Sequence, residues 1–386
     1  MNILLTGIDG YLGWPVALGL SKNLHDCIIW GVDNFGRRKW VEECGAISAT
    51  PVADMKMRLE IARRHGFNNI RFIEGDLINR DFVYETIKSL KPDIIVHIAA
   101  QPSAPYSHLS GEKANFTQHN NNQSTRNLLW AVKENELLDV HFIETTTTGV
   151  YGAPNIPIPE GFLRINIDGK EDTLPYPGLA TSWYHMSKAN DVNNLYLANR
   201  MWKLSITDLR TSIIYGIETD ETRLDLGLCT RFDFDFYFGV VIHRFCAMAL
   251  CGYPLLVYGR GKQEKPFISL RDAVNSIVKA AKIQPERSFR VFNQFTEIKS
   301  IVNIANHIMD AARERGINIP VKHIPNPRVE REEHKMEISN NGFMRLLGGI
   351  EQNMEEGVRN IVSVIMNFKD KIEKFKHRFL PKEINT

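Results

Sequence analysis

The sequence has no long apolar run. Within its 386 residues no stretch of 18 consecutive apolar residues occurs, and charged residues interrupt the longest candidates. This excludes a membrane-spanning helix. The first residues, MNILLTGIDGYLG, contain neither a basic segment nor a signal-cleavage pattern, and their apolar run ends at Gly7, so we interpret them as a buried strand. We therefore expect a cytoplasmic protein that binds no membrane.

Net charge and cysteine are also scarce. The 47 Lys and Arg residues nearly balance the 45 Asp and Glu residues, for a formal charge of +2. No overall field therefore attracts nucleic acid, and any bound anion needs a local site. The 5 cysteines are odd in number and contain no Cys-x-x-Cys pair, which favours reduced core thiols over disulfides.

What the sequence does contain is typical of a folded globular protein, with 43% apolar and 24% charged residues. Short apolar runs alternate with helical patterns in the first half, and we predict strands at NILLTG, CIIWGVD, IRFIEGD, DIIVHIAA and DVHFIETTT. Strands that are apolar on both faces belong to a parallel sheet covered by helices. The predicted fold is therefore a doubly wound α/β (Rossmann) sheet, with ligands at the carboxyl ends of the strands.

The length predicts two domains or one large unit. We place the first domain at 1–216 and a smaller α/β lobe at 217–386, some of whose segments can return to the first domain. The lobe contains PLLVYG, FRVFNQF and VKHIP as short strands, and an amphipathic helix near 354–376.

Two segments interrupt the regular order of the first domain. Near 162–174 the sequence alternates around Asp168-Gly169, which suits a type I′ hairpin turn. The hairpin is either a flap over the site or a surface feature without a role. The polar run QHNNNQS at 118–124 is expected to cap the helix that begins with TRNLLW.

A glycine-rich turn follows the first predicted strand. Gly7, Gly10 and Gly13 have the spacing Gly-x-x-Gly-x-x-Gly before a helix. There glycine allows close approach of a pyrophosphate, and the helix N-terminus supplies free amides. Asp33 ends the second strand at the distance expected for a residue that binds the adenosine ribose. Together these features predict a dinucleotide site.

The charged residues after the second strand bear on the choice of dinucleotide. The carboxylate of Asp33 repels a 2′-phosphate and so favours NAD over NADP, although Arg37 and Arg38 weaken this preference. Asp76 follows the third strand. It either contacts the adenine amine or is an ordinary loop aspartate.

Two further motifs indicate chemistry. Tyr184 and Lys188 are four residues apart, so one helix face presents both. An adjacent cation lowers a tyrosine pKa, and we expect Tyr184 to be a usable general base. Thr147 ends the fifth strand with a hydroxyl that can orient a substrate alcohol, whereas Thr145 and Thr146 are interpreted as strand formers.

These three signals, in this order, resemble the extended short-chain dehydrogenase/reductase family, which acts on nucleotide sugars. The resemblance covers nearly the whole chain, and finer strings are similar to one branch, the UDP-sulfoquinovose synthases. The strings are VDN at 32–34 with RR at 37–38, SAPYS at 103–107, TQHNN at 117–121, DTLPYP at 172–177, YH at 184–185, YG at 215–216 with TDE at 219–221, FNQFTE at 292–297 and PNPRVE at 325–330.

The resemblance implies NAD as cofactor, UDP-glucose and sulfite as reactants, a homodimer, and no metal. Tyr184 would take the proton of the sugar 4-OH, with Thr147 orienting it and Lys188 stabilising the phenolate. His185 is the candidate for proton transfer at C5 or C6; the alternative is a packed helix histidine. The implied cofactor-binding residues are Gly7, Gly10, Tyr11, Leu12, Gly13, Asp33, Asn34, Arg37, Arg38, Asp76, Leu77, Ala99, Gln101, Asn121, Tyr184 and Lys188. The implied substrate-binding residues are Gln101, Ser103, Thr147, Tyr215, Lys265, Gln294 and Arg328.

The sequence also departs from the pattern of this branch. Val150 stands where plant members carry a glutamate, so a possible proton-transfer group is missing. Pro102 and Lys265 each replace an arginine, and Arg210-Thr211 replaces an Asn-Gln pair. Lys265 keeps the charge but loses the bidentate fork that suits phosphate.

Three other functions were weighed. A nucleotide-sugar 4-epimerase needs only the Thr, Tyr and Lys set, and is the main alternative. A 4,6-dehydratase places an Asp-Glu pair where this chain has Thr148 and Gly149, which cannot supply its acid and base. A non-catalytic NAD-binding scaffold is disfavoured because Thr147, Tyr184 and Lys188 are all present.

Overall fold

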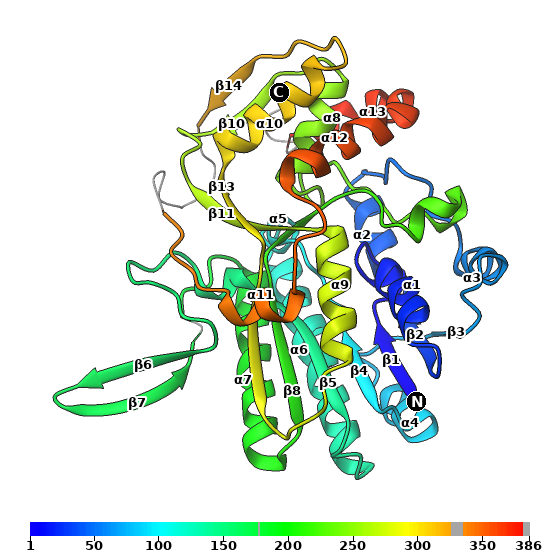
Figure 1. The fold of residues 1–386 in the computed structure, drawn as a ribbon, viewed down its shortest axis with the longest axis vertical. Coiled ribbons are helices and arrows are strands. Elements are labelled where there is room, and N and C mark those ends of the chain that lie inside the picture. The colour runs from blue at the N-terminus through cyan, green and yellow to red at the C-terminus, as the bar shows by residue number, and fades with distance from the viewer. Residues whose placement is uncertain (177, 326–334, 381–386) are drawn as a thin grey trace.

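A computed structural model of the chain describes residues 1–176, 178–325 and 335–380. Its centre is a seven-stranded parallel sheet with the strand order β12-β8-β5-β4-β1-β2-β3 (Figure 1). The strands are β1 (Asn2–Thr6), β2 (Ile28–Asp33), β3 (Ile70–Glu74), β4 (Ile94–His97), β5 (His141–Thr147), β8 (Ser205–Thr211) and β12 (Phe289–Gln294). The strand order reverses between β1 and β4, where a ligand crevice is expected. The predicted doubly wound fold is confirmed.

Helices cover both faces of this sheet. On one face α4 (Arg80–Leu90), α6 (Gly111–Glu134) and α7 (Trp183–Trp202) pack side by side. On the other face lie α1 (Gly13–Asn23), α9 (Leu270–Ala281) and α11 (Asn341–Leu347), with α9 against α1 (Figure 1). The shorter helices α2 (Gly36–Glu43), α3 (Met55–Arg64) and α5 (Ala104–Ser107) stand in the connections near the carboxyl ends of the strands.

The second lobe packs around its own core. The helices α8 (Val241–Leu250), α10 (Ile301–Arg313) and α12 (Met354–Ile365) contact one another beside a two-stranded sheet. That sheet consists of β10 (Leu255–Tyr258) and β14 (Val321–Ile324), and a three-stranded sheet of β9 (Ile213–Tyr215), β11 (Glu264–Ser269) and β13 (Glu297–Ser300) lies between the lobes. Short 3-10 turns span Thr148–Tyr151, Thr222–Leu224, Leu226–Leu228, Met366–Phe368 and Lys376–Arg378.

The strand at FRVFNQF is one segment of 217–386 that returns to the first domain, because it is β12 and pairs with β8 at the edge of the large sheet. Two other expectations need correction. The predicted helix near 354–376 is two helices, α12 and α13 (Lys369–Lys374), joined by a 3-10 turn. The polar run at 118–124 lies in the middle of α6, because Ser110 caps that helix by accepting a hydrogen bond from the Lys113 amide.

The predicted hairpin forms, but it does not cover a site. The strands β6 (Phe162–Ile167) and β7 (Lys170–Pro175) pair around Asp168 and Gly169, which both have positive φ as a type I′ turn requires. The hairpin projects away from the body (Figure 1), and its tip residue Ile167 is 65% exposed. The interpretation as a surface hairpin therefore describes it better than a flap.

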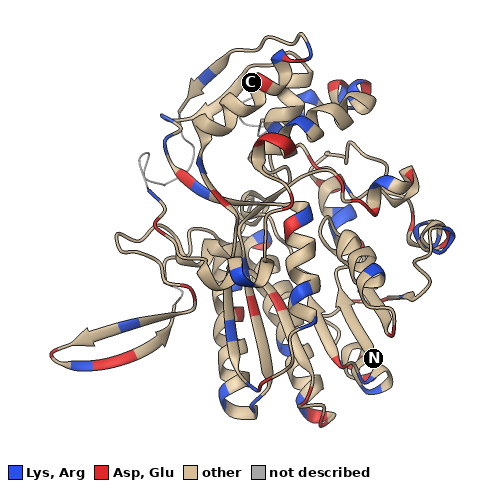
Figure 2. Ribbon diagram, in the orientation of Figure 1, with Lys and Arg blue, Asp and Glu red and all other residues tan. Residues whose placement is uncertain are grey.

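The surface and the cysteines agree with the composition. Residues of both charge signs are distributed over both lobes (Figure 2). The five cysteines, all in the described residues, form no disulfide. In the described part of the chain no helix combines the length and the apolar character that a membrane crossing needs.

Candidate active site

A large cavity opens where the strand order reverses, between the sheet and the second lobe. Its volume is about 1150 Å³, above the ~300–1,000 Å³ of ordinary ligand pockets, so it has room for a dinucleotide and a second ligand. The predicted site residues that line it are Gly7, Gly10, Tyr11, Leu12, Gly13, Asp33, Asn34, Arg37, Asp76, Leu77, Ala99, Ser103, Thr147, Tyr184, His185, Lys188 and Lys265.

The glycine turn forms one end of the cavity. Gly7 has a φ of +80°, and a Cβ there would lie 2.9 Å from the backbone of Ala99. A Cβ on Gly13, the first residue of α1, would lie 1.9 Å from the Gly7 carbonyl oxygen. Only glycine permits this approach of helix to turn, and the amides at the start of α1 then face the cavity. The turn therefore fits the pyrophosphate of a dinucleotide.

Asp33 lies beside this turn with its carboxylate held in place. Its Oδ2 accepts a hydrogen bond from the Asp9 amide (2.9 Å) and its Oδ1 one from the Phe35 amide (2.8 Å). Burial raises the pKa of Asp33 to about 6. Near neutral pH the carboxylate is therefore ionised and able to accept hydrogen bonds from ribose hydroxyls.

The two arginines that follow are both engaged by carboxylates. Arg37 binds Asp233 (2.7 Å), and Arg38 makes two hydrogen bonds of 2.6 Å to the two carboxylate oxygens of Asp9. Because both guanidinium groups are already paired with carboxylates, neither is placed to bind a 2′-phosphate. The two arginines therefore no longer argue against a preference for NAD. Asp76 accepts a hydrogen bond from Asn34 (3.0 Å) at the same end of the cavity.

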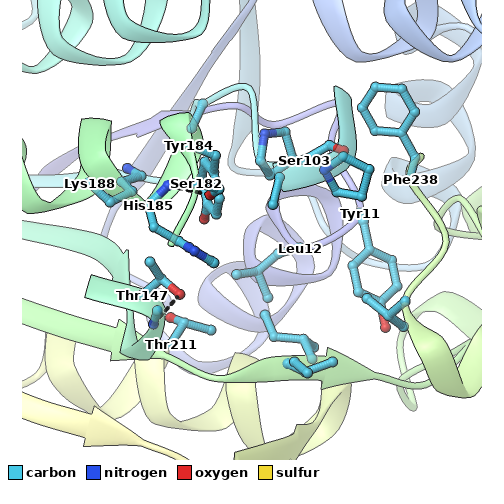
Figure 3. Close-up of a pocket in the computed structure, with 18 of the residues that line it drawn as sticks. Tyr11, Leu12, Ser103, Thr147, Ser182, Tyr184, His185, Lys188, Thr211 and Phe238 are labelled. Atoms are coloured by element: carbon cyan, nitrogen blue, oxygen red, sulfur yellow. Dashed lines mark hydrogen bonds between the residues drawn. The ribbon is translucent and has the colours of Figure 1, made fainter. Parts of the chain in front are cut away.

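Tyr184 lies at the start of α7, opposite the end of β5. The hydroxyl of Ser182 caps this helix by accepting from the His185 amide (3.0 Å). The cap fixes the first turn so that the Tyr184 ring points into the cavity beside Thr147 (Figure 3). The Thr147 hydroxyl is near enough to the phenol to lower its pKa slightly.

The pKa of Tyr184 differs from the sequence-based expectation. Burial raises it above the usual value of phenol, while Lys188 and the Thr147 hydroxyl oppose this rise. The expected net lowering by Lys188 is therefore wrong for this state of the protein. The main reason is burial of the phenol. In addition, Lys188 is itself paired, since its Nζ lies 3.2 Å from Glu144 Oε1 and 3.8 Å from Asp191 Oδ2.

His185 follows Tyr184 and lies over a glycine. A Cβ on Gly149 would be 2.3 Å from His185 Cδ2 and 2.4 Å from Nε2. The imidazole therefore occupies the space that a side chain at position 149 would need. Nδ1 lies 3.2 Å from the Thr181 hydroxyl, and the ring points into the cavity (Figure 3). Val150, by contrast, is fully buried in an apolar cluster with Ile158.

Five predicted site residues lie behind the cavity wall rather than on it. They are Arg38, Gln101, Asn121, Tyr215 and Gln294, none of which lines the cavity. The Asn121 side chain accepts from the Gln101 amide (2.8 Å) and donates to the Ser187 hydroxyl (2.9 Å). Gln294 donates to the Ser276 hydroxyl (2.8 Å). These polar groups support the wall instead of facing a ligand.

Tyr215 and Arg328 need separate mention. Tyr215 is fully buried, and a Cβ on Gly357 of α12 would lie 2.6 Å from its ring. It therefore packs between the lobes. Arg328 lies outside the described residues, so its predicted contact with a diphosphate has no structural counterpart here.

The sequence analysis missed Arg244, which lines the cavity from α8. Its guanidinium lies over the rings of Phe236 (5.6 Å) and Tyr258 (5.9 Å), and the residue as a whole is only 5% exposed. The only sequence signal was a single arginine inside the apolar segment VVIHRFCAMAL. A buried cation in a ligand cavity suits an anionic ligand group.

Comparison with known proteins gives consistent results. Residues 3–293 match the model of the NAD dependent epimerase/dehydratase family. The chain is 38% identical to the chloroplastic UDP-sulfoquinovose synthase of Spinacia oleracea over 376 residues, which are 96% of this chain and 77% of that protein. It is also 38% identical to the UDP-sulfoquinovose synthase of Sulfolobus acidocaldarius over 384 residues, 99% of this chain and 97% of that one.

Solved structures show the same fold. The UDP-glucuronic acid 4-epimerase of Bacillus cereus, in complex with UDP-glucuronic acid and NAD, superposes with a TM-score of 0.69 at 21% identity, covering 95% of this chain and 99% of that one. The UDP-glucose 4-epimerase of Thermotoga maritima, solved with UDP-glucose, gives the same TM-score at 18% identity.

Proposed function

The chain belongs to the NAD dependent epimerase/dehydratase family, and from this premise we propose that it is a UDP-sulfoquinovose synthase, an NAD-dependent enzyme that converts UDP-glucose and sulfite to UDP-sulfoquinovose. The observation that carries the proposal is the 38% identity over nearly the full chain to two proteins of that name. The cavity supports it, because Thr147, Tyr184, His185 and Lys188 converge there.

The dinucleotide site follows from the glycine turn and Asp33. The amides at the start of α1 bind the pyrophosphate, and Asp33 accepts hydrogen bonds from the adenosine ribose. Bound NAD supplies an acceptor for the hydride from C4 of the sugar and returns that hydride at the end of the cycle. Tyr184 and Lys188, which line another part of the same cavity, would hold the nicotinamide end of the cofactor.

Tyr184 is the general base of the first oxidation. Its phenolate takes the proton of the sugar 4-OH while the hydride leaves C4, and Thr147 orients both oxygens. The product is a 4-ketone. The same phenol returns its proton to O4 when the hydride comes back, so this pair of steps leaves the protein unchanged.

Elimination and sulfite addition take place between these two hydride transfers. The ketone acidifies the C5 proton, and loss of that proton with the 6-OH as water gives a conjugated 4-keto-5,6-ene. Sulfite adds to C6 through sulfur while a proton returns to C5. His185 is the proton-transfer group for C5 or C6, because Val150 is apolar and buried whereas the imidazole faces the cavity.

The nucleotide lies on the side of the second lobe. Lys265 of β11 and Arg244 of α8 line that part of the cavity and supply positive charge for the diphosphate of UDP-glucose. Arg328 is a third candidate from the resemblance. Ser103 lines the wall nearer the sugar.

Exposed apolar side chains support a homodimer. On α7, Trp183, Met186, Leu197 and Met201 are 50%, 42%, 54% and 63% exposed, and their spacing places them on one helix face. Trp130 of the neighbouring α6 is 47% exposed. Several exposed apolar side chains on one face favour an interface, and two such helix pairs from two copies would cover each other.

The test is incubation with UDP-glucose, NAD and sulfite, followed by mass spectrometry of the nucleotide sugar. We expect a nucleotide sugar with a sulfonate in place of the 6-OH, dependent on sulfite. Formation of UDP-galactose without any sulfonated product would instead identify a 4-epimerase. A protein that exchanges no hydride between UDP-glucose and NAD would be a scaffold.

A further inference from the structure

The ammonium of Lys188 is held by two carboxylates in a dry part of the protein. Its Nζ lies 3.2 Å from Glu144 Oε1 and 3.8 Å from Asp191 Oδ2, and the three side chains are 2%, 0% and 0% exposed. Glu144 belongs to β5 and points at Lys188 from the sheet, while Asp191 lies on α7 one turn further on. Buried charges at such distances interact far more strongly than exposed ones.

The two carboxylates differ in how they are satisfied. Asp191 Oδ1 accepts a hydrogen bond from Asn122 (2.9 Å), whereas Asp191 Oδ2 has no hydrogen-bond partner among the residues that the structure describes. Glu144 Oε1 is bound by Lys188, and within the described residues Glu144 Oε2 has no hydrogen-bond partner. Lys188 is thus the group on which the charge of Glu144 depends.

The other polar groups around this cluster do not replace Lys188. On β4, burial lowers the pKa of His97 far below its usual value, so its ring is neutral. On β8, Asp208 is paired with Arg210 (2.9 Å). On α6, Arg126 is exposed and acts on Asp191 only through space. The charge of the cluster is therefore set by one ammonium and two carboxylates.

This arrangement acts on the proposed base. Burial raises the pKa of the Tyr184 phenol, Lys188 opposes this rise, and the charges of Asp191 and Glu144 add to it. For the cluster itself, burial raises the pKa of Glu144 well above its usual value, although Lys188 opposes this rise. Burial would lower the pKa of Lys188, but Glu144 and Asp191 overcome that effect and raise it. Lys188 therefore stays protonated, but the nearby carboxylates offset much of the effect of its positive charge on Tyr184.

We propose that Glu144 is a positioning residue that acts through Lys188: it draws the ammonium toward β5, and so the Tyr184 phenol keeps its proton more firmly than it would beside an unpaired ammonium. This proposal rests on the proposed function for its role in catalysis. The titration that tests it does not depend on that function.

A firmly held phenol proton would help catalysis because of the order in which bonds break and form. In the first step the O–H bond of the sugar 4-OH breaks and its proton binds the Tyr184 oxygen, while the hydride leaves C4 and the nicotinamide becomes neutral. Elimination and sulfite addition then occur before the proton is needed again at O4. A phenol that holds its proton firmly in this neutral state keeps the acid in place for the final reduction.

The experiment is an alkaline titration of tyrosinate absorbance in binary complexes with NADH and with NAD, without sugar or sulfite. Subtracting the same titration of Tyr184→Phe, alone or combined with Glu144→Gln, isolates Tyr184 from the other tyrosines. In the NADH complex we expect Glu144→Gln to lower the midpoint by about one pH unit or more, because the freed ammonium favours the phenolate. We expect the wild-type midpoint to be lower with NAD than with NADH.

An unchanged or raised midpoint in Glu144→Gln would overturn the proposal, because Glu144 would then carry no charge that Lys188 has to balance. Asp191→Asn is the companion variant and decides the question if Glu144→Gln does not fold. Since Asp191 lies 3.8 Å from Nζ and has a second partner, we expect a shift in the same direction but smaller. A protein that forms no sulfonated sugar would refute the proposed function, but the titration midpoints would still decide the role of Glu144.

Discussion

At the scale of single residues, the site is a set of proton carriers whose properties depend on their immediate neighbours. Tyr184 and His185 are adjacent in the chain, yet one faces Thr147 and the other lies over Gly149. Because α7 fixes both side chains in its first turn, small substitutions there can separate the oxidation from the elimination. The first two predictions use this.

Tyr184→Phe should abolish hydride transfer while UDP-glucose still binds. The ring and its packing remain, and only the proton acceptor is lost, which in general costs a factor of ~10²–10⁴ in rate. NADH formation in a single turnover measures the rate, and calorimetry measures binding. Ordinary activity in this variant would mean that another group is the base.

His185→Ala should still form NADH from UDP-glucose but should not exchange the C5 proton with deuterated solvent. Gly149→Ala provides a matched variant, because its Cβ would displace the imidazole while Tyr184 is left in place. Exchange is measured by NMR of the recovered sugar. Exchange at the wild-type rate in His185→Ala would reduce this residue to packing, and loss of NADH formation would show damage to Tyr184 instead.

NAD binding should weaken as the pH falls through about 6. Burial raises the pKa of Asp33 to about 6, and only the ionised carboxylate accepts hydrogen bonds from the ribose hydroxyls. Affinity is therefore full above this pKa and declines below it, which calorimetry between pH 5 and pH 8 would measure. In Asp33→Asn this part of the pH dependence should disappear, and discrimination against NADP should fall; a pH profile identical to wild type would argue against the assignment.

The residues that the sequence located were those whose motif requires a fixed backbone geometry. The glycine turn, Asp33 and the Tyr-x-x-x-Lys pair all line the cavity, because strand-turn-helix geometry leaves little freedom in where they point. Asn121 and Gln101 lie in equally specific strings but bond to each other. Glu144 and Arg244 were missed, since a single charged residue in an apolar strand or helix has no periodic signal.

At the scale of elements, hydrophobic alternation located the strands well, whereas helix boundaries were less reliable. The run of asparagines in α6 has the composition of a cap but the environment of a helix interior, because its side chains bond across to α7. Such tertiary hydrogen bonds override the local preference of asparagine for turns. The hairpin was predicted from the alternation of residues around its turn dipeptide, since Asp-Gly suits a type I′ turn.

Replacing 163–174 with Gly-Gly should leave sulfonation essentially unchanged. No residue of the hairpin lines the cavity in the described structure, and the base of the hairpin is anchored by Phe162, whose ring packs on Tyr196 and Phe289. Steady-state kinetics with UDP-glucose and sulfite provides the measurement. A large rise in KM, with an unchanged circular dichroism spectrum, would revive the flap.

At the scale of the whole molecule, the apolar face of α6 and α7 sets the expected assembly. Leu197→Glu combined with Met201→Glu should convert the homodimer to a monomer, because two buried carboxylates would face their own copies across the interface. Light scattering after gel filtration measures the mass. Leu226→Glu, at a leucine elsewhere that is even more exposed (68%), should leave the mass unchanged. A wild-type protein that is already monomeric would refute the interface.

The position of β12 has a consequence for how the protein is made. This strand completes the large sheet at its edge beside β8, yet more than 70 residues, many of them in the second lobe, separate the two in the chain. During synthesis, β8 leaves the ribosome long before its neighbour, with one row of backbone hydrogen-bonding groups unpaired and open to other chains. The sheet of the first domain is thus completed late, although its first strand is made early. A truncation after residue 216, which looks like a natural boundary, would remove the edge strand β12 from that sheet.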